Sequence, residues 1–105
     1  MTEEILKAAG IPGKEGRFPD PPPTTYAVYF SDVTTDGPDG YNCLFTHDDT
    51  VELYEPTKDD AALSAFESEL DAHGIHWTKQ PRYWLQNVQR YQTIYEYSYI
   101  EKRRM

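Results

Sequence analysis

The feature that most constrains the fold is a stretch near the C-terminal end, VQRYQTIYEYSYIEK (88–102), which alternates with period two. Such alternation predicts a long β-strand. One face would carry Tyr91, Thr93, Tyr95, Tyr97 and Tyr99, and the other Val88, Gln92, Ile94, Glu96 and Ile100. The tyrosine row is expected either to lie under a helix or to contact another protein subunit, since aromatic residues are enriched at interfaces. Stacking on nucleic acid is disfavoured, because few cations accompany the rings.

Several other segments have the character of strands. TTYAVYFSDV (24–33) alternates, with Tyr26, Val28 and Phe30 on one face and apolar residues on the other, which predicts a strand well inside a sheet. The segments 41–46 and 50–56 are also extended, and the polar HDD between them leaves two alternatives, one long bent strand or the two arms of a hairpin. The shorter candidates are IHWTKQ (75–80) and RYWLQN (82–87), which Pro81 separates.

Two helices are expected. The clearer one begins after Thr57, predicted as its N-cap, and carries an apolar stripe of Ala62, Leu63, Phe66 and Leu70. It ends before Gly74, and Ile75 is placed to contact Leu70 across that glycine. Residues 1–10 predict a second, short helix with Thr2 as its cap, which must pack on the rest of the chain to be stable.

A proline-rich segment follows the short helix. Residues 12–23 contain five prolines and two glycines, so we expect an extended connector without regular structure, anchored by Phe18. The chain is therefore predicted to be a single domain over 1–105, with a helix at 1–10, a connector at 11–23 and a body at 24–105. Its expected class is α+β, an antiparallel or mixed sheet of about four strands with two helices packed on one face.

Charge is distributed unevenly along the sequence. The net charge is −8 in all, but residues 32–74 carry twelve acids and one base, whereas residues 75–105 carry six bases and two acids. Such segregation favours either head-to-tail attraction between copies or neutralisation within one chain. In the first case, the acidic residues Asp48, Asp49, Glu52 and Glu55 would face Arg82, Arg90, Arg103 or Arg104 of a neighbour, with Tyr95 and Tyr97 as further interface candidates.

The candidates for chemistry are few. His47, Asp48 and Asp49 form the densest group of metal-ligating side chains, which His73 or His76 could join to make a metal-dependent hydrolase. Their spacing matches no metal-binding motif, so a polar turn is the simpler interpretation. Cys43 lies in an apolar run and is expected to act as a small core residue. The sequence thus predicts no enzyme, no metal, no cofactor and no membrane span, and a pI near 4.7 argues against direct nucleic-acid recognition.

The order of segments resembles a known family. The chain has a short helix ending in GIP, a proline-rich stretch leading into an aromatic strand, a VELY strand followed by TKD and an acidic helix start, and a closing hairpin. The most specific pieces are Val51-Glu52-Leu53-Tyr54, Thr57-Lys58-Asp59 and Gln92-Thr93-Ile94-Tyr95-Glu96. This pattern resembles the small tail-completion, or head–tail joining, proteins of long-tailed bacteriophages and prophages of Gram-positive bacteria.

The resemblance implies a virion structural protein. Such proteins are similar to tail terminators, which have an α+β fold, form a ring, commonly of six subunits, at the head-proximal end of the tail, and have no catalytic residues. The expected partners are further copies of the chain and other tail or connector proteins, and the expected location is the virion tail, assembled in the host cytoplasm. The alternative is a small acidic phage-encoded inhibitor, a DNA mimic that occupies a basic surface on its partner.

Overall fold

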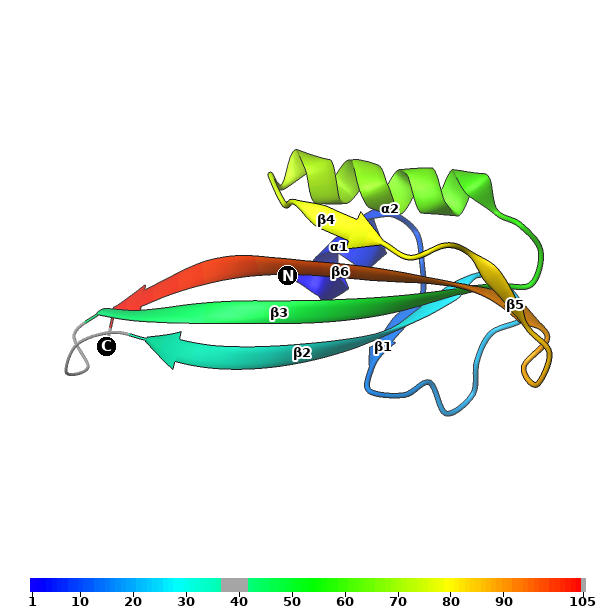
Figure 1. The fold of residues 1–105 in the computed structure, drawn as a ribbon, viewed down its shortest axis with the longest axis horizontal. Helices are drawn as coiled ribbons and strands as arrows, with labels where there is room; N and C mark the ends of the chain where they lie inside the picture. Colours follow the sequence, from blue (N-terminus) through cyan, green and yellow to red (C-terminus); the bar gives the residue numbers. More distant parts are fainter. Residues whose placement is uncertain (37–41, 105) are drawn as a thin grey trace.

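Three long strands organise the structure, a computed structural model that describes residues 1–36 and 42–104 (Figure 1). The elements in chain order are α1 (Thr2–Ala8), β1 (Gly13–Glu15), β2 (Tyr26–Asp36), β3 (Asn42–Glu55), α2 (Asp60–Ala72), β4 (Trp77–Lys79), β5 (Tyr83–Leu85) and β6 (Arg90–Arg104). The sheet order is β1-β2-β3-β6-β4, and β5 also pairs with β6. The predicted α+β class is confirmed, although the described residues form six strands rather than about four.

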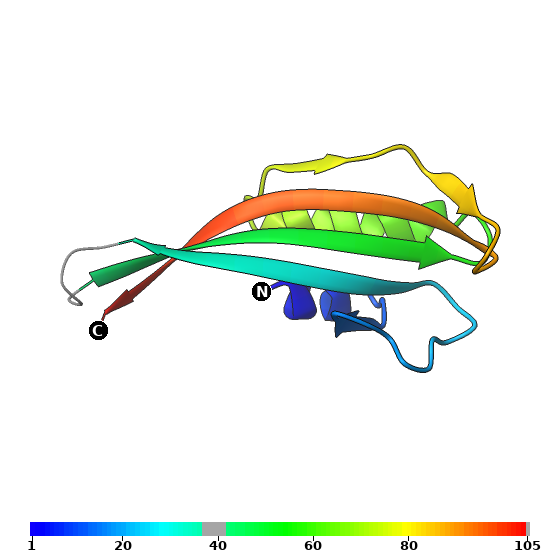
Figure 2. The ribbon, with the colours of Figure 1, turned by 60° about the horizontal axis from the view of Figure 1, so that its bottom comes forward.

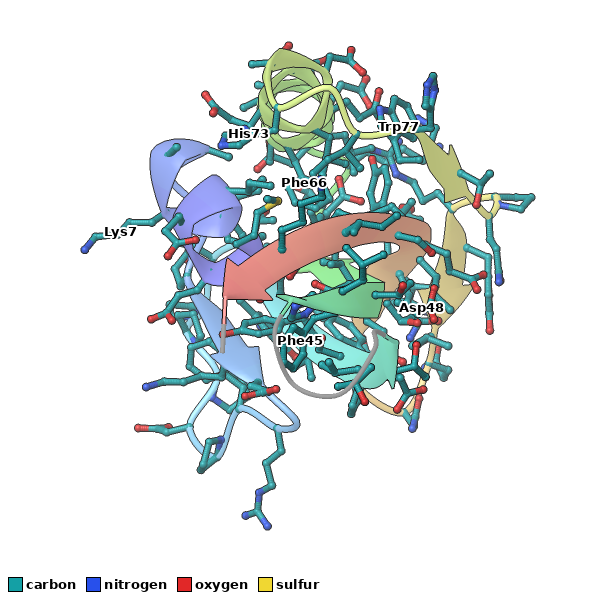
Figure 3. All side chains as sticks on the ribbon, turned by 90° about the vertical axis from the view of Figure 1, so that its left-hand side faces the viewer. Lys7, Phe45, Asp48, Phe66, His73 and Trp77 are labelled. Atoms are coloured by element: carbon teal, nitrogen blue, oxygen red, sulfur yellow. The ribbon has the colours of Figure 1, made fainter. Side chains whose placement is uncertain are left out.

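Both helices lie against one face of the sheet (Figure 2). On that face the register aligns Tyr29 with Val51 and Val51 with Tyr95, and the neighbouring Leu53 is fully buried. From α2, the buried ring of Phe66 meets Tyr95 edge-on, with their centroids 4.9 Å apart (Figure 3). The apolar stripe predicted for this helix therefore forms the centre of the core, as expected for an amphipathic helix on a sheet.

The ends of α2 agree in part with prediction. Gly74 has a φ of +69°, and the amide of Ile75 donates to the carbonyl of Leu70 at 3.0 Å, as the glycine-terminated motif requires. The predicted N-cap is wrong. Asp59, two residues after Thr57, caps the helix by accepting a hydrogen bond from the amide of Ala62.

The N-terminal helix forms within its predicted range, but Thr2 does not cap it. Met1 occupies the N-cap position, and the buried hydroxyl of Thr2 donates to Asp49 of β3 and contacts the hydroxyl of Tyr97 on β6. Because Thr2 lies one residue inside the helix, its side chain is directed to the sheet and makes no capping hydrogen bond to the first-turn amides. Thr2 therefore docks α1 on the sheet.

The proline-rich segment contains an element that was not expected. β1 lies inside it and pairs in parallel with β2, from Gly13 opposite Ala27 to Glu15 opposite Tyr29. The prediction of a connector without regular structure is wrong here, because residues 13–18 lack proline and keep their amide donors. Phe18 does act as an anchor, since its ring packs edge-on against Tyr26 at 5.3 Å.

β3 settles the alternative left open for residues 41–54, because residues 42–55 form one continuous strand. The HDD sequence lies in mid-strand, so its interpretation as a polar turn is wrong. Its side chains find partners on both faces of the sheet. His47 Nε2 lies 3.0 Å from Glu101 Oε1, Asp48 accepts from the hydroxyl of Ser98, and Asp49 accepts from Thr2.

The long strands are much longer than the helix that covers them. At about 1.5 Å per residue, α2 with its 13 residues spans about 20 Å, whereas β6 with 15 residues spans about 50 Å at about 3.3 Å per residue. The distal parts of β2, β3 and β6 consequently extend beyond both helices, at the left of Figure 1. We call this three-stranded part, made of Asp32–Asp36, Asn42–Asp48 and Ser98–Arg104, the arm.

The first prediction concerns the core under α2. Replacing the fully buried Phe66 by alanine leaves a cavity and should lower the free energy of unfolding by about 3–5 kcal/mol. The same substitution at Phe30, which is 44 % exposed, should cost less than about 1 kcal/mol. Urea denaturation followed by circular dichroism measures both. Equal losses for the two variants would contradict the assignment of the core.

The second prediction concerns alkaline stability. Burial raises the pKa of Tyr54 to about 12, and burial together with its hydrogen bond to Glu67 raises the pKa of Tyr95 well above 10. In the unfolded chain tyrosine ionises near pH 10, so stability is fully present below that pH and falls as the pH rises from 10 toward the folded values. Denaturation between pH 9 and about 12 should show little change up to pH 10 and, above it, a decline of about 1 kcal/mol per pH unit from Tyr95 alone, and Tyr95→Phe should reduce this slope.

Candidate assembly surface

One predicted contact between subunits lies instead within the chain. The fully buried carboxylate of Glu55 accepts hydrogen bonds from Arg82 Nε at 3.1 Å and Nη2 at 2.9 Å, and Arg82 also bonds to Asp60. Desolvation lowers the pKa of Arg82, but its hydrogen bonds to Asp60 and Glu55 outweigh this effect and hold the pKa above the ordinary value. The assignment of Glu55 and Arg82 to different copies is therefore corrected, and neutralisation within the chain accounts for this pair.

Three further predicted interface residues are buried. Asp49 lies under the start of α1, where it accepts from Thr2, and Tyr97 is buried in the same cluster. Tyr95 lies under α2 and donates to Glu67 at 2.5 Å. These side chains are covered by helices of their own chain, so the assignment of Asp49, Tyr95 and Tyr97 to a subunit interface is corrected.

The remaining acidic candidates lie on the face of the sheet opposite the helices. The alternation of the strands puts Asp48 and Glu52 on the face opposite the helices, together with Asp32 and Glu96. These four carboxylates are named the acidic face. Arg90 lies at the start of β6 and donates to the carbonyl of Gln89. Arg103 and Arg104 continue the β6 backbone, and their side chains lie outside the described part of the structure.

The arm has two strand edges without neighbours among the described residues. β1 pairs with β2 only as far as Tyr29, so the outer side of β2 is open from Phe30 onward. β4 pairs with β6 only as far as Tyr97, so the outer side of β6 is open from Ser98 onward. An open edge presents backbone donors and acceptors that can pair with another strand.

Apolar side chains are exposed along the same edges. Val33 on β2 is 48 % exposed, and Ile100 on β6 is 66 % exposed, the highest value among the large apolar residues of the described chain. Phe30, at the base of the arm, is also exposed. Long open strands that carry exposed apolar groups favour association with another strand, so this part of the molecule is the best candidate for an assembly surface.

Polar contacts stiffen the arm. The ring of His47 on β3 stacks on Tyr99 of β6, with centroids 4.6 Å apart and planes 6° apart, and the same imidazole reaches Glu101. At the base of the arm an open hollow of about 290 Å³ lies beside the start of α1, lined in part by Glu3, Glu15 and Asp49. The stacked pair lines this hollow as well, and as a cross-strand contact it stabilises the pairing of β3 with β6 at this point.

The chemical alternatives gain no support from the arrangement. No group of three or more histidine, cysteine or acidic side chains in the described ranges could hold a metal ion. His47 lies on the arm, whereas His73 caps α2, where its Nδ1 is 2.8 Å from the carbonyl of Glu69. Neither α1 nor α2, the helices of the described residues, has the length and apolar character needed to cross a membrane.

The arm itself was not foreseen from the sequence. The sequence signal that would predict an arm is a strand much longer than the helix covering it. The alternating segment 88–102 has 15 residues in extended conformation, whereas the helix ends before Gly74. That comparison needs residues 41–54 to be a single strand, and the polar HDD concealed this. Two of the charged candidates, Glu55 and Arg82, lie instead at the opposite end of the sheet, where they form a buried pair.

The third prediction concerns that pair. Arg82→Ala leaves the carboxylate of Glu55 buried with only the amide of Asp59 as a donor, and should lower the free energy of unfolding by about 3 kcal/mol at neutral pH. Arg17→Ala, on the exposed connector, is the matched control and should change it by less than about 0.5 kcal/mol. Adding Glu55→Gln to the Arg82→Ala variant should recover part of the loss. A variant as stable as the wild type in chemical denaturation would contradict the proposed role of the pair.

No protein-family model matches this chain, and no curated protein matches it significantly. The features that bear on function are the arm, the acidic face and the order of segments.

Proposed function

We propose that this protein is a structural component of a bacteriophage or prophage tail, which completes the tail or joins it to the head as a ring of identical copies. The observation that carries the proposal is the arm, a long three-stranded extension with open edges and exposed apolar side chains. In a monomer the open strand edges of the arm would favour aggregation, whereas in an assembly they can pair with another chain. The resemblance to tail-completion proteins supports the same role.

A structural role also fits how the charged residues are used. The buried Glu55–Arg82 pair joins β3 to the segment before β5, and Thr2 joins α1 to the sheet. These polar groups hold the helices and sheet together rather than converging on a reaction site. The expected partners are other copies of the chain and neighbouring tail or connector proteins, and the expected location is the virion tail.

A second candidate function follows from the acidic face. Asp32, Asp48, Glu52 and Glu96 lie on one face of the sheet, opposite the helices, and a DNA mimic needs its carboxylates spread over a single surface in this manner. This alternative is a small acidic inhibitor that binds a basic groove of its partner. It predicts a monomer or dimer rather than a ring, so the two candidates differ in stoichiometry.

The fourth prediction tests the ring. Light scattering over a concentration series, at low salt and at about 0.15 M salt, should show a discrete species, with about 73 kDa expected for six copies of a 12.2 kDa chain. The species should weaken as salt rises, because charge contributes to the contacts. Negative-stain electron microscopy should show rings.

The matched variants of this test differ only in position. Ile100→Asp, on the arm, should abolish the large species, whereas Val88→Asp, at an exposed apolar site outside the arm, should leave it intact. A monomer at every concentration would instead favour the acidic inhibitor, as would a tight complex with a basic partner that Asp48→Lys disrupts.

A further inference from the structure

We propose that neighbouring copies join through their arms, with the open β2 edge of one copy pairing in parallel with the open β6 edge of the next. The inference rests on the proposed self-assembly and specifies its contact and its symmetry. The occupant of each open edge is thus a second copy of this chain. The two edges would close on each other through main-chain hydrogen bonds, as when a strand is added to a sheet.

The geometry of the sheet gives the direction of this pairing. β2 and β6 are each antiparallel to β3, so within one copy they run in the same direction on opposite sides of the arm. A second copy related by rotation about an axis inclined to the strands, as strands are inclined in a closed barrel, brings its β6 beside the first copy's β2, parallel to it and with the same face outward. Within one copy Asp32 is level with Ser98, so a shift of four residues at the junction sets Asp32 beside Lys102 of the neighbour, and Phe30 beside Ile100. Phe30 and Ile100 both lie on the face opposite the helices, so this arrangement brings these two exposed apolar side chains to the same side of the junction.

Charge selects this pairing over the two symmetric ones. Among the described side chains on the face opposite the helices, the open β2 edge carries Asp32 and no base, whereas the open β6 edge carries Lys102 and no acid. Two β2 edges facing each other would bring acid against acid, and two β6 edges would bring base against base. Like charges directly opposite destabilise a strand pair, and opposite charges stabilise it. Only the β2–β6 junction is complementary.

The position of the charges within the strands supports the same junction. Asp32 and Lys102 lie on the same face of the sheet, since Asp32 aligns with Asp48 and Ser98, and Lys102 is four residues beyond Ser98 on β6. In a continuous sheet across two copies these side chains therefore share a surface. A contact between different patches of identical copies is heterologous, and such contacts produce a closed ring when the rotation between copies closes.

The fifth prediction tests the junction with charge reversals. Asp32→Lys and Lys102→Asp each place like charges at every junction, so each variant alone should need about tenfold higher concentration than the wild type to assemble. A one-to-one mixture of the two should restore wild-type assembly at low salt. In an alternating ring, every second junction sets the Asp32→Lys site of one variant against the Lys102→Asp site of the other, so opposite charges meet there. The remaining junctions are those of the wild type.

The controls keep the charge change and move it away from the edges. Asp20→Lys on the connector and Lys7→Asp on α1, whose side chain points away from the molecule in Figure 3, should assemble as the wild type does. Circular dichroism confirms that every variant is folded. Light scattering then gives the concentration at half assembly for each variant and for the mixture.

The outcomes separate this inference from the proposed function. Rings of the wild type together with unchanged assembly of both single variants would overturn the edge pairing and leave the tail-ring proposal standing. Failure of the mixture to recover would likewise overturn the pairing. A wild type that remains monomeric at all concentrations would overturn both. Loss in each variant and recovery in the mixture supports the β2–β6 junction.

Discussion

The arm exists because the rise per residue is much larger in a strand than in a helix. A helix of 13 residues covers less than half of a strand of 15, so α2 can bury only the proximal part of β3 and β6. With Thr2, the short α1 extends this cover to Asp49 and Tyr97, and beyond them the sheet continues with both faces uncovered. The difference in length between α2 and β6 therefore determines which part of the sheet forms the core with its buried tyrosines and which part projects as the arm.

The same constraint divides the charged residues into two groups. Where helices cover the sheet, a buried carboxylate needs a hydrogen-bonded or charged partner to offset the loss of solvent. Glu55 has two such partners, the guanidinium of Arg82 and the amide of Asp59. Where the sheet is uncovered, Asp32 and Lys102 remain in solvent and are available to another molecule. Burial therefore decides, residue by residue, whether a charge is neutralised within the chain or stays exposed to solvent.

Local patterns predicted the elements well and their connections less well. The alternation at 24–33 and 88–102 and the stripe ending at Gly74 were sufficient for β2, β6 and α2, because period and capping are local properties. β1 was missed because its pairing with β2 is a tertiary contact, and the surrounding prolines argued against it. The polar HDD concealed the continuity of β3, since its partners Ser98, Glu101 and Thr2 are distant in sequence. The site depends on these long-range pairings, so the charged residues alone indicated the wrong contacts.

The proposed heterologous edge pairing could also produce an open filament instead of a ring, and the geometry of the arm disfavours this outcome. A junction that repeats without closing produces a filament, and open apolar edges favour this outcome. The right-handed twist of strands rotates each strand relative to its neighbour, so in the proposed junction successive copies would be rotated relative to one another rather than stacked as a flat sheet. In the proposed junction, Asp32 at one edge and Lys102 at the other favour the β2–β6 contact over symmetric dimers. Twist and charge together therefore favour a closed ring over the alternatives that open edges alone would permit.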